Sequence, residues 1–313
     1  MMGDDETQIV HLQGPIPQRN EFHRSKPAGL EGPAGAWEVS RTLVDLGAAF
    51  LNELRTISDE RRIRDLVLIA LLRRALVTGE GFRALLWHGL LEPAQGTFRT
   101  LLDIEMSVRL ILGDPSDRMA KRLGAYHYLT YRKHGQDLLH NPTTRTDTLA
   151  KAGRIPEVIE VAKSYARLLE SPVFDEIRAD LDKGGHWHGY SNVEAAFRAA
   201  GMETEYHMSY DSATWFVHSV NVEFDYTDVQ GSTTTLRSLV ERDPKVIQLH
   251  LGLGMLRLHA LIGLLVDTLG MPKAWEAFDP CVARFPDGSE VEVGPFKLVG
   301  HQLMEAFGGS PDE

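Results

Sequence analysis

Cysteine is almost absent from this sequence, and so is any excess of positive charge. Cys281 is the single cysteine of the 313 residues, so no disulfide can form within the chain. Lysine and arginine number 33 against 44 acidic residues, and the net charge of −11 opposes non-specific attraction to a phosphate backbone. We therefore expect no DNA binding. The acidic start of the chain lacks the basic patch and apolar run of a secretory signal, which predicts a cytoplasmic protein.

Long uninterrupted apolar runs and phosphate-binding glycine loops are also missing. The most apolar stretch, residues 246–266, contains His250, Arg257 and His259, each of which is costly at the centre of a bilayer. We expect a central bundle helix there, and no membrane association. No glycine-rich loop follows a predicted strand, and strands do not alternate with helices, so a nucleotide-binding α/β fold is excluded.

What the sequence does contain is apolar residues at helical spacing. The pattern predicts an all-α fold, a multi-helix bundle of about nine or ten helices with a small C-terminal β-hairpin. Residues 1–36 are rich in glycine and proline and predict a flexible tail, residues 37–280 the helical bundle, and residues 281–313 the hairpin and a short helix. The hairpin is expected at residues 282–285 and 290–293, around a Pro-Asp-Gly turn.

Turn and cap residues set the expected helix boundaries. Gly79 and Gly81 are expected to break a helix that begins after Asp59, and a short helix over 82–91 should end before Pro93. The next helix should run from about 95 to 112. Further helices are expected over 118–139, 156–170 and 172–183.

Two later helices have clear start signals. Ser191 and Glu194 resemble a capping box, with Gly201 ending that helix, and one longer helix should span about 203–220. After a polar loop, Asp243 and Pro244 should begin the apolar helix.

Glu105 lies in the middle of the apolar face of the helix over 95–112. An unpaired buried carboxylate costs several kcal/mol or stays protonated, so Glu105 needs a cationic or hydrogen-bonding neighbour. Arg99 or Arg122 could supply it. A structural ion pair and a functional carboxylate both remain open.

Histidines occur in two further patterns. His207, Asp211, Thr214 and His218 follow one another at spacings of four, three and four on the expected helix 203–220. They could form a metal site or an acid–base pair, but paired helical zinc ligands are absent and we predict no metal.

The second pattern, His-Trp-His-Gly-Tyr at 186–190, favours two surface histidines flanking a buried Trp187. Arginine–histidine pairs like those of RNA-cleaving helical domains occur at Arg83–His88 and Arg122–His127. Such pairs are no more frequent than chance predicts.

Three stretches resemble one known family. They are GTFRTLLDIEMSVRLIL at 96–112, RMAKRLGAYHYLTYRKH at 118–134 and HWHGYSNVEAAFRAAGMETEYHMSYDSATWFVH at 186–218. Together they are similar to the bacterial domain of unknown function 5677, over roughly residues 60–220. The first stretch matches the arginine and acid of the family helix at Arg99 and Asp103, although the family more often has glutamate at the second position.

The resemblance implies a helical bundle and an intracellular bacterial protein, and it carries no known activity. The polar positions that it shares are Arg99, Asp103, Tyr210, Ser212 and His218. Together with four further residues they complete the candidate site. The catalytic candidates are Arg99, Asp103, Glu105 and His218, and the binding candidates are Tyr210, Ser212, Trp187, Arg122 and Tyr126.

Two functions fit these residues. The first is an effector of toxin or phage-defence type that acts on RNA or a nucleotide. It would be a nuclease or nucleotide hydrolase, with Arg99 holding phosphate and His218 as acid or base. The second is a non-catalytic module that binds a small ligand or partner protein around a buried polar network. Glycines 252, 254 and 263 of the apolar helix would also permit close packing against a second subunit, and so a homodimer.

Overall fold

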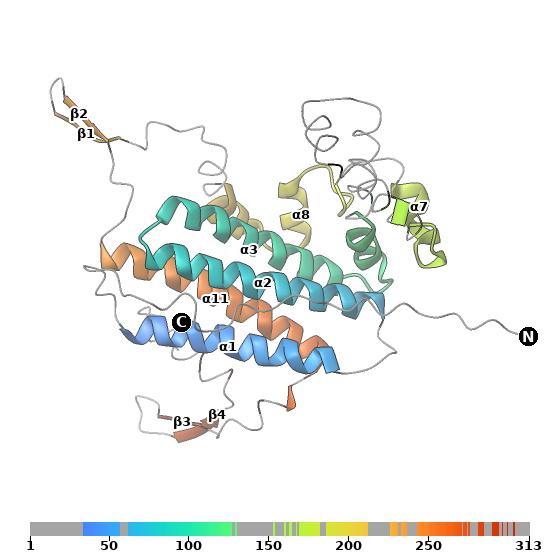
Figure 1. The fold of residues 1–313 in the computed structure, drawn as a ribbon, viewed down its shortest axis with the longest axis horizontal. Helices are drawn as coiled ribbons and strands as arrows, with labels where there is room; N and C mark the ends of the chain where they lie inside the picture. The colour runs from blue at the N-terminus through green and yellow to red at the C-terminus, as the bar shows by residue number, and fades with distance from the viewer. Residues whose placement is uncertain are drawn as a thin grey trace, which may run out of the picture.

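The structure is a computed structural model of the 313-residue chain (Figure 1). It describes residues 34–56, 62–126, 169–181, 186–211 and 243–270, the strands 226–230, 233–236, 281–284 and 290–293, and single positions between and after them. The described part is mostly helical, as the sequence predicts. Residues 1–33, most of the predicted tail, lie outside it.

Four long helices form the main core: α1 (Ala34–Thr56), α2 (Ile63–Trp87), α3 (Leu91–Leu112) and α11 (Pro244–Leu269). In Figure 1 they lie beside one another, and α2 contacts each of the other three. The apolar face of α1 shows the helical spacing of three to four residues, and its members Leu43, Leu46, Phe50 and Leu54 are all buried. Burial of such faces, at about 25 cal/mol per Å² of apolar surface, is what holds helices of this length together.

The boundaries of α11 follow from its first residues. The Asp243 carboxylate accepts a hydrogen bond from the Lys245 amide at 2.9 Å, and Pro244 occupies the first turn, where its missing N–H costs nothing. Among the described residues α11 is the one helix that is long and apolar enough to cross a membrane, and half of its most apolar window is buried inside the protein. Leu251, Leu258 and Ile262 pack in the core.

The predicted break after Gly79 is wrong, because α2 continues to Trp87. A Cβ atom at Gly79 would lie 2.8 Å from Leu258 Cδ2, so this glycine lets α11 pack closely against α2. The start of α3 is also earlier than predicted. Pro93 lies in its first turn, where the backbone amides have no partner within the helix.

Close packing also explains the glycines of α11. A Cβ at Gly254 would lie 2.2 Å from Phe82 Cε1, and one at Gly263 would lie 3.5 Å from the Phe296 ring. These two glycines therefore lie against aromatic rings of the same chain.

The region after residue 190 differs most from the prediction. Asn192, not Ser191, caps α8 (Val193–Ala199), and its side-chain oxygen accepts from the Ala195 amide at 2.8 Å. Gly201 ends the turn with φ 70°, as predicted. The predicted helix over 203–220 begins with α9 (Glu203–Glu205) and continues through η2, a π-helical turn over Tyr206–Tyr210, while residues 212–220 lie outside the described residues. Such wide turns re-aim side chains and often mark functional sites.

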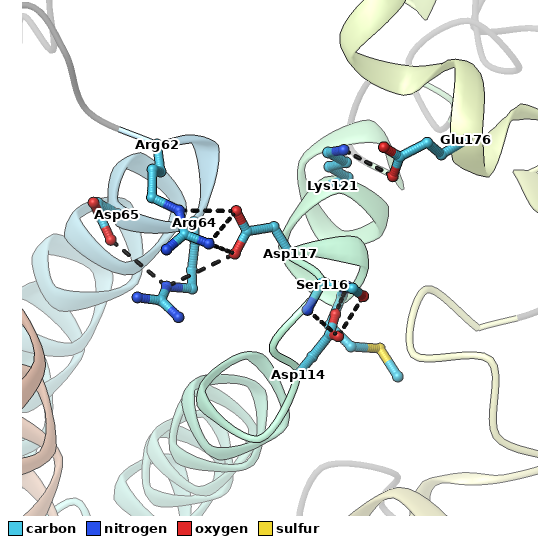
Figure 2. A network of polar contacts seen from close by, with 9 residues as sticks. Arg62, Arg64, Asp65, Asp114, Ser116, Asp117, Lys121 and Glu176 are labelled. Carbon is cyan, nitrogen blue, oxygen red and sulfur yellow. Dashed lines mark hydrogen bonds and ion pairs between the residues drawn. The ribbon is translucent and has the colours of Figure 1, made fainter.

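Residues 118–126 form a helix that is anchored by the polar contacts of Figure 2. Asp114 caps it by accepting from the Ser116 and Met119 amides at 2.9 and 2.6 Å. Arg62, at the start of α2, donates to the Asp117 carboxylate at 2.8 and 3.1 Å, and Lys121 pairs with Glu176 of α7 (Asp175–Leu181) at 2.8 Å. The network places this helix beside α2 and the short turn η1 (Pro172–Phe174) with α7.

Two pairs of strands lie outside the helical core. β1 (Tyr226–Gln230) pairs antiparallel with β2 (Thr233–Leu236), where the sequence predicted a polar loop. β3 (Cys281–Arg284) pairs antiparallel with β4 (Glu290–Val293) in the segment for which a hairpin is expected.

The packing of Phe82 on Gly254 predicts opposite effects of two glycine substitutions. Gly254→Ala should lower the free energy of unfolding by about 1–3 kcal/mol, because the fully buried Phe82 ring has no room to move. Gly81→Ala, where nothing lies within 4 Å, should raise it by about 0.5–1 kcal/mol through helix propensity. Urea unfolding measures both, and equal effects would contradict the packing argument.

Candidate functional site

The candidate residues on α3 fall on two different faces. Arg99 and Asp103 are one helical turn apart and share a face, whereas Glu105 is rotated well away from both. Arg99 and Asp103 are half-buried and Glu105 is fully buried. The structure therefore divides the predicted set into two polar clusters, each of which reaches the segment 203–210.

The first cluster joins Arg99, Asp103 and Tyr210. The Arg99 guanidinium lies over the Tyr210 ring, with Cζ 4.7 Å from the ring centroid, and Nη2 donates to the Tyr210 hydroxyl at 3.0 Å. Tyr210 in turn donates to the Asp103 carboxylate. These three residues, all predicted from the family resemblance, come together although Tyr210 follows Arg99 by more than a hundred residues.

Burial controls the protonation of this cluster. It raises the pKa of Asp103 above its usual range, and the charge of Arg99, the hydrogen bond from Tyr210 and the charge of Arg74 offset only part of that effect. Burial, together with the Asp103 charge, also raises the pKa of Tyr210 to about 12. Tyr210 is therefore a hydrogen-bond donor at neutral pH and not a base, while Asp103 is a stronger base than an ordinary aspartate.

One donor of this cluster is unused. Arg99 Nε is buried and has no hydrogen-bond partner, and no carboxylate among the described residues lies within ion-pair distance of Arg99. A guanidinium that is stacked on an aromatic ring and is not neutralised by an ion pair is suited to oxyanions such as phosphate and carboxylate.

The second cluster surrounds Glu105. Arg109 donates Nε and Nη2 to Glu105 Oε1 at 3.0 and 2.8 Å, and Arg257 Nη1 of α11 lies 3.8 Å from the same oxygen. The prediction that Arg99 or Arg122 pairs with Glu105 is therefore wrong, because an arginine one turn along the same helix reaches the carboxylate more directly. Glu105 Oε2 is buried without a partner.

Arg257 links this cluster to α9. Its Nη1 also lies 3.0 Å from Glu205 Oε1, so the charge order is Glu205, Arg257, Glu105, Arg109. Segment 203–210 is thus tied at one end through Arg257 and at the other through Arg99. Two arginines hold the π-helical turn over α3.

A third polar group forms around residues 186–190. Arg122 Nε donates to the Trp187 carbonyl at 2.7 Å, and Gly189, at φ 76°, faces the Arg122 guanidinium, which a Cβ would meet at 2.9 Å. Trp187 is half-buried and packs on the core, whereas His188 is 4% exposed. The sequence predicted that both histidines of this motif lie at the surface. His186 is exposed, but His188 is buried.

His188 is held as a neutral imidazole. Its Nδ1 accepts from the Tyr190 amide at 3.1 Å, which puts the proton of the neutral ring on Nε2. Burial, then the charges of His186 and Arg122, lower the pKa of His188 to about 4. The ring stacks on His186 with centroids 5.0 Å apart.

The other candidates are placed less centrally. Tyr126 is 40% exposed on the helix 118–126, and His207 and Asp211 are exposed. His218 and Ser212 lie outside the described residues, as does Thr214. Within the residues that the structure describes, no group of three or more histidine, cysteine or acidic side chains is arranged to hold a metal ion.

Sequence reasoning missed Arg74, Arg109, Arg257 and His188 as members of these clusters. Arg109 carried a signal, because it follows Glu105 by four residues. Arg83 was considered in an arginine–histidine pair, but it is buried and donates to Ser40 at 2.8 Å and Glu80 at 2.6 Å, while His88 is exposed. Its role is to join α1 to α2.

The low pKa of His188 predicts a loss of stability in acid. The unfolded chain takes up this proton near pH 6.5 and the folded chain only near pH 4, so the stabilisation is complete above pH 6.5 and is lost between these values. The loss should reach about 1–3 kcal/mol. His188→Asn keeps an acceptor for the Tyr190 amide but does not titrate, so urea unfolding at pH 7.5 and 4.5 should show a smaller drop for the variant. Equal drops would contradict the prediction.

Comparison with known proteins identifies one family. A family model described as a family of unknown function (DUF5677) matches residues 65–233, more than half of the 313 residues. The match spans α2, α3, α8 and η2, and therefore all of the clusters above except Arg257. Neither the search of curated proteins nor the search of solved structures found a match. The chain therefore belongs to the family of unknown function DUF5677.

Proposed function

We propose that this protein acts on RNA or a nucleotide by holding a phosphate group on Arg99. The observation that carries the proposal is the state of the Arg99 side chain. It is oriented by the Tyr210 ring and hydroxyl, its Nε has no partner, and no carboxylate among the described residues neutralises it by an ion pair. An arginine held in one orientation with its charge unpaired is suited to binding a phosphate group.

Asp103 and Tyr210 position this arginine. Tyr210 is 4% exposed, so its ring is a fixed support for the guanidinium, and its raised pKa keeps the hydroxyl protonated. The Asp103 carboxylate holds that hydroxyl in place and limits the net positive charge. In the proposal His218, one of the polar positions shared with the family, is the acid or base of the reaction.

The proposal extends to the setting in which such an activity would operate. A toxin or phage-defence effector in a bacterial cytoplasm fits a protein that acts on RNA or nucleotides. The net charge of −11 restricts nucleic-acid contact to local cationic positions such as Arg99, in place of a broad basic surface.

Phosphate binding by the purified full-length chain tests the proposal. Inorganic phosphate and adenosine monophosphate should bind, and Arg99→Lys should weaken both about tenfold because lysine keeps the charge but loses the planar fork and the stacking. Arg73→Ala, which removes an arginine of α2, is the control and should change affinity less than about twofold. Calorimetric titration measures all three proteins.

Turnover separates an enzyme from a binder. The wild-type chain should convert labelled RNA or nucleotides faster than both Arg99→Ala and His218→Ala. If the wild type and the His218 variant leave the substrates equally unchanged while phosphate still binds, the catalytic part of the proposal fails. If Arg99→Lys and Arg99→Ala both bind phosphate as tightly as the wild type, the Arg99 site itself is refuted.

A second candidate is a non-catalytic module that binds a small ligand or a partner protein. The observation that favours it is Glu105, which is 0% exposed and pairs with Arg109 while its second oxygen has no partner. A buried network of this kind fixes how helices pack, and it would leave the ligand to be held without chemistry. Binding with no turnover is the result expected of this candidate.

A further inference from the structure

We propose that Arg74 of α2 and Arg99 of α3 form a two-cation site for a ligand with two neighbouring phosphate groups, a nucleoside diphosphate or the backbone of RNA. The inference rests on the proposed function, since Arg99 is taken to hold the first phosphate. It adds the second contact and the substrate class, neither of which follows from Arg99 alone.

The packing of α2 against α3 brings Arg74 to the level of this cluster. The two helices form an antiparallel pair joined by residues 88–90, and they lie side by side in Figure 1. The Phe82 and Phe98 rings, 6.0 Å apart, fix the register of the pair. Arg74 precedes Phe82 by eight residues, and position 106 follows Phe98 by eight. In an antiparallel pair these two positions lie at the same level, so Arg74 is less than one turn beyond Asp103.

The offset between the two arginines suits neighbouring phosphates. Along α3, Arg99 lies seven residues before position 106, which is opposite Arg74. This corresponds to about 10 Å along the helix axis. Asp103 lies between them, and the charges of both arginines act on its carboxylate. Two long side chains from neighbouring helices, both close enough for their charges to act on one carboxylate, can also contact adjacent groups of a bound oxyanion chain.

Arg74 is available for such a contact. Its side chain is exposed, and no carboxylate of the described helices forms an ion pair with it. Other arginines of this pair of helices and its ends are engaged, as Arg62 is with Asp117 and Arg109 is with Glu105. Arg73, the adjacent residue, points about 100° away around the helix and provides a matched control of equal charge.

Asp103 sets the charge of the site. Two guanidinium groups and one carboxylate leave one net positive charge, and a bound anion would raise the pKa of Asp103 further by like-charge repulsion. Ligand binding should therefore be accompanied by proton uptake at Asp103. The carboxylate opposes the anion rather than contacting it.

Pyrophosphate and inorganic phosphate, titrated into the full-length chain, test the second contact. The wild type should prefer pyrophosphate by about tenfold, and Arg74→Ala should lose that preference while its affinity for phosphate changes less than about twofold. Arg73→Ala should keep the preference. An Arg74 variant that behaves like the Arg73 variant, or a wild type with no preference, overturns this inference while the Arg99 site stands. A wild type that binds neither ion overturns both.

Two natural ligands identify the source of the phosphates. Adenosine diphosphate and a trinucleotide of RNA each carry two neighbouring phosphate groups, and at least one should bind more tightly to the wild type than to Arg74→Ala. The tighter of the two gives the source. Equal affinity of the wild type and the Arg74 variant for both ligands would contradict the proposal.

Asp103→Asn gives an independent check. Removing the opposing charge should tighten pyrophosphate binding about threefold to tenfold and abolish the proton uptake that accompanies it, measured by calorimetry in buffers of different ionisation enthalpy. Weaker binding in this variant would mean that Asp103 serves mainly to position Arg99 through Tyr210, and it would refute the assigned charge balance.

Discussion

The ion pair between the fully buried Glu105 and two arginines is the constraint on which the arrangement of this protein depends. A carboxylate in the apolar face of α3 is tolerated only where cationic groups reach it, and Arg109 and Arg257 do so from two helices. Arg257 then extends the network to Glu205. The positions of α3, α11 and α9 are therefore coupled through one charge, and the turn that carries Tyr210 follows directly from α9.

The placement of Tyr210 gives the Arg99 cluster its chemistry. A phenol ring on a regular helical continuation would point in another direction, whereas the π-helical turn directs it toward α3. The proposed phosphate recognition depends on residues far from the ligand, because Arg257 and Glu205 hold the start of the turn. Mutations in that remote pair would then weaken binding without removing any contact to the anion.

Much of the core could be predicted from the sequence, because apolar spacing and caps are local signals. Leu43 to Leu54 and the Asp243 cap are examples. A break after Gly79 was predicted wrongly. This glycine is needed for close contact with Leu258 of a distant helix, and such a contact leaves no local trace in the sequence. The cluster of Arg99, Asp103 and Tyr210 came from the family resemblance, since nothing local joins residues on α3 to η2. Partner choice for Glu105 and the burial of His188 depend on three-dimensional packing, which spacing alone does not determine.

The π-helical turn over Tyr206–Tyr210 has a consequence for comparing this chain with its relatives. A turn closed by hydrogen bonds five residues apart holds one residue more than an α-helical turn. A relative in which this turn is α-helical would match it by a one-residue gap between positions 203 and 210. Without that gap, every residue after the turn would be aligned with the neighbour of its true counterpart.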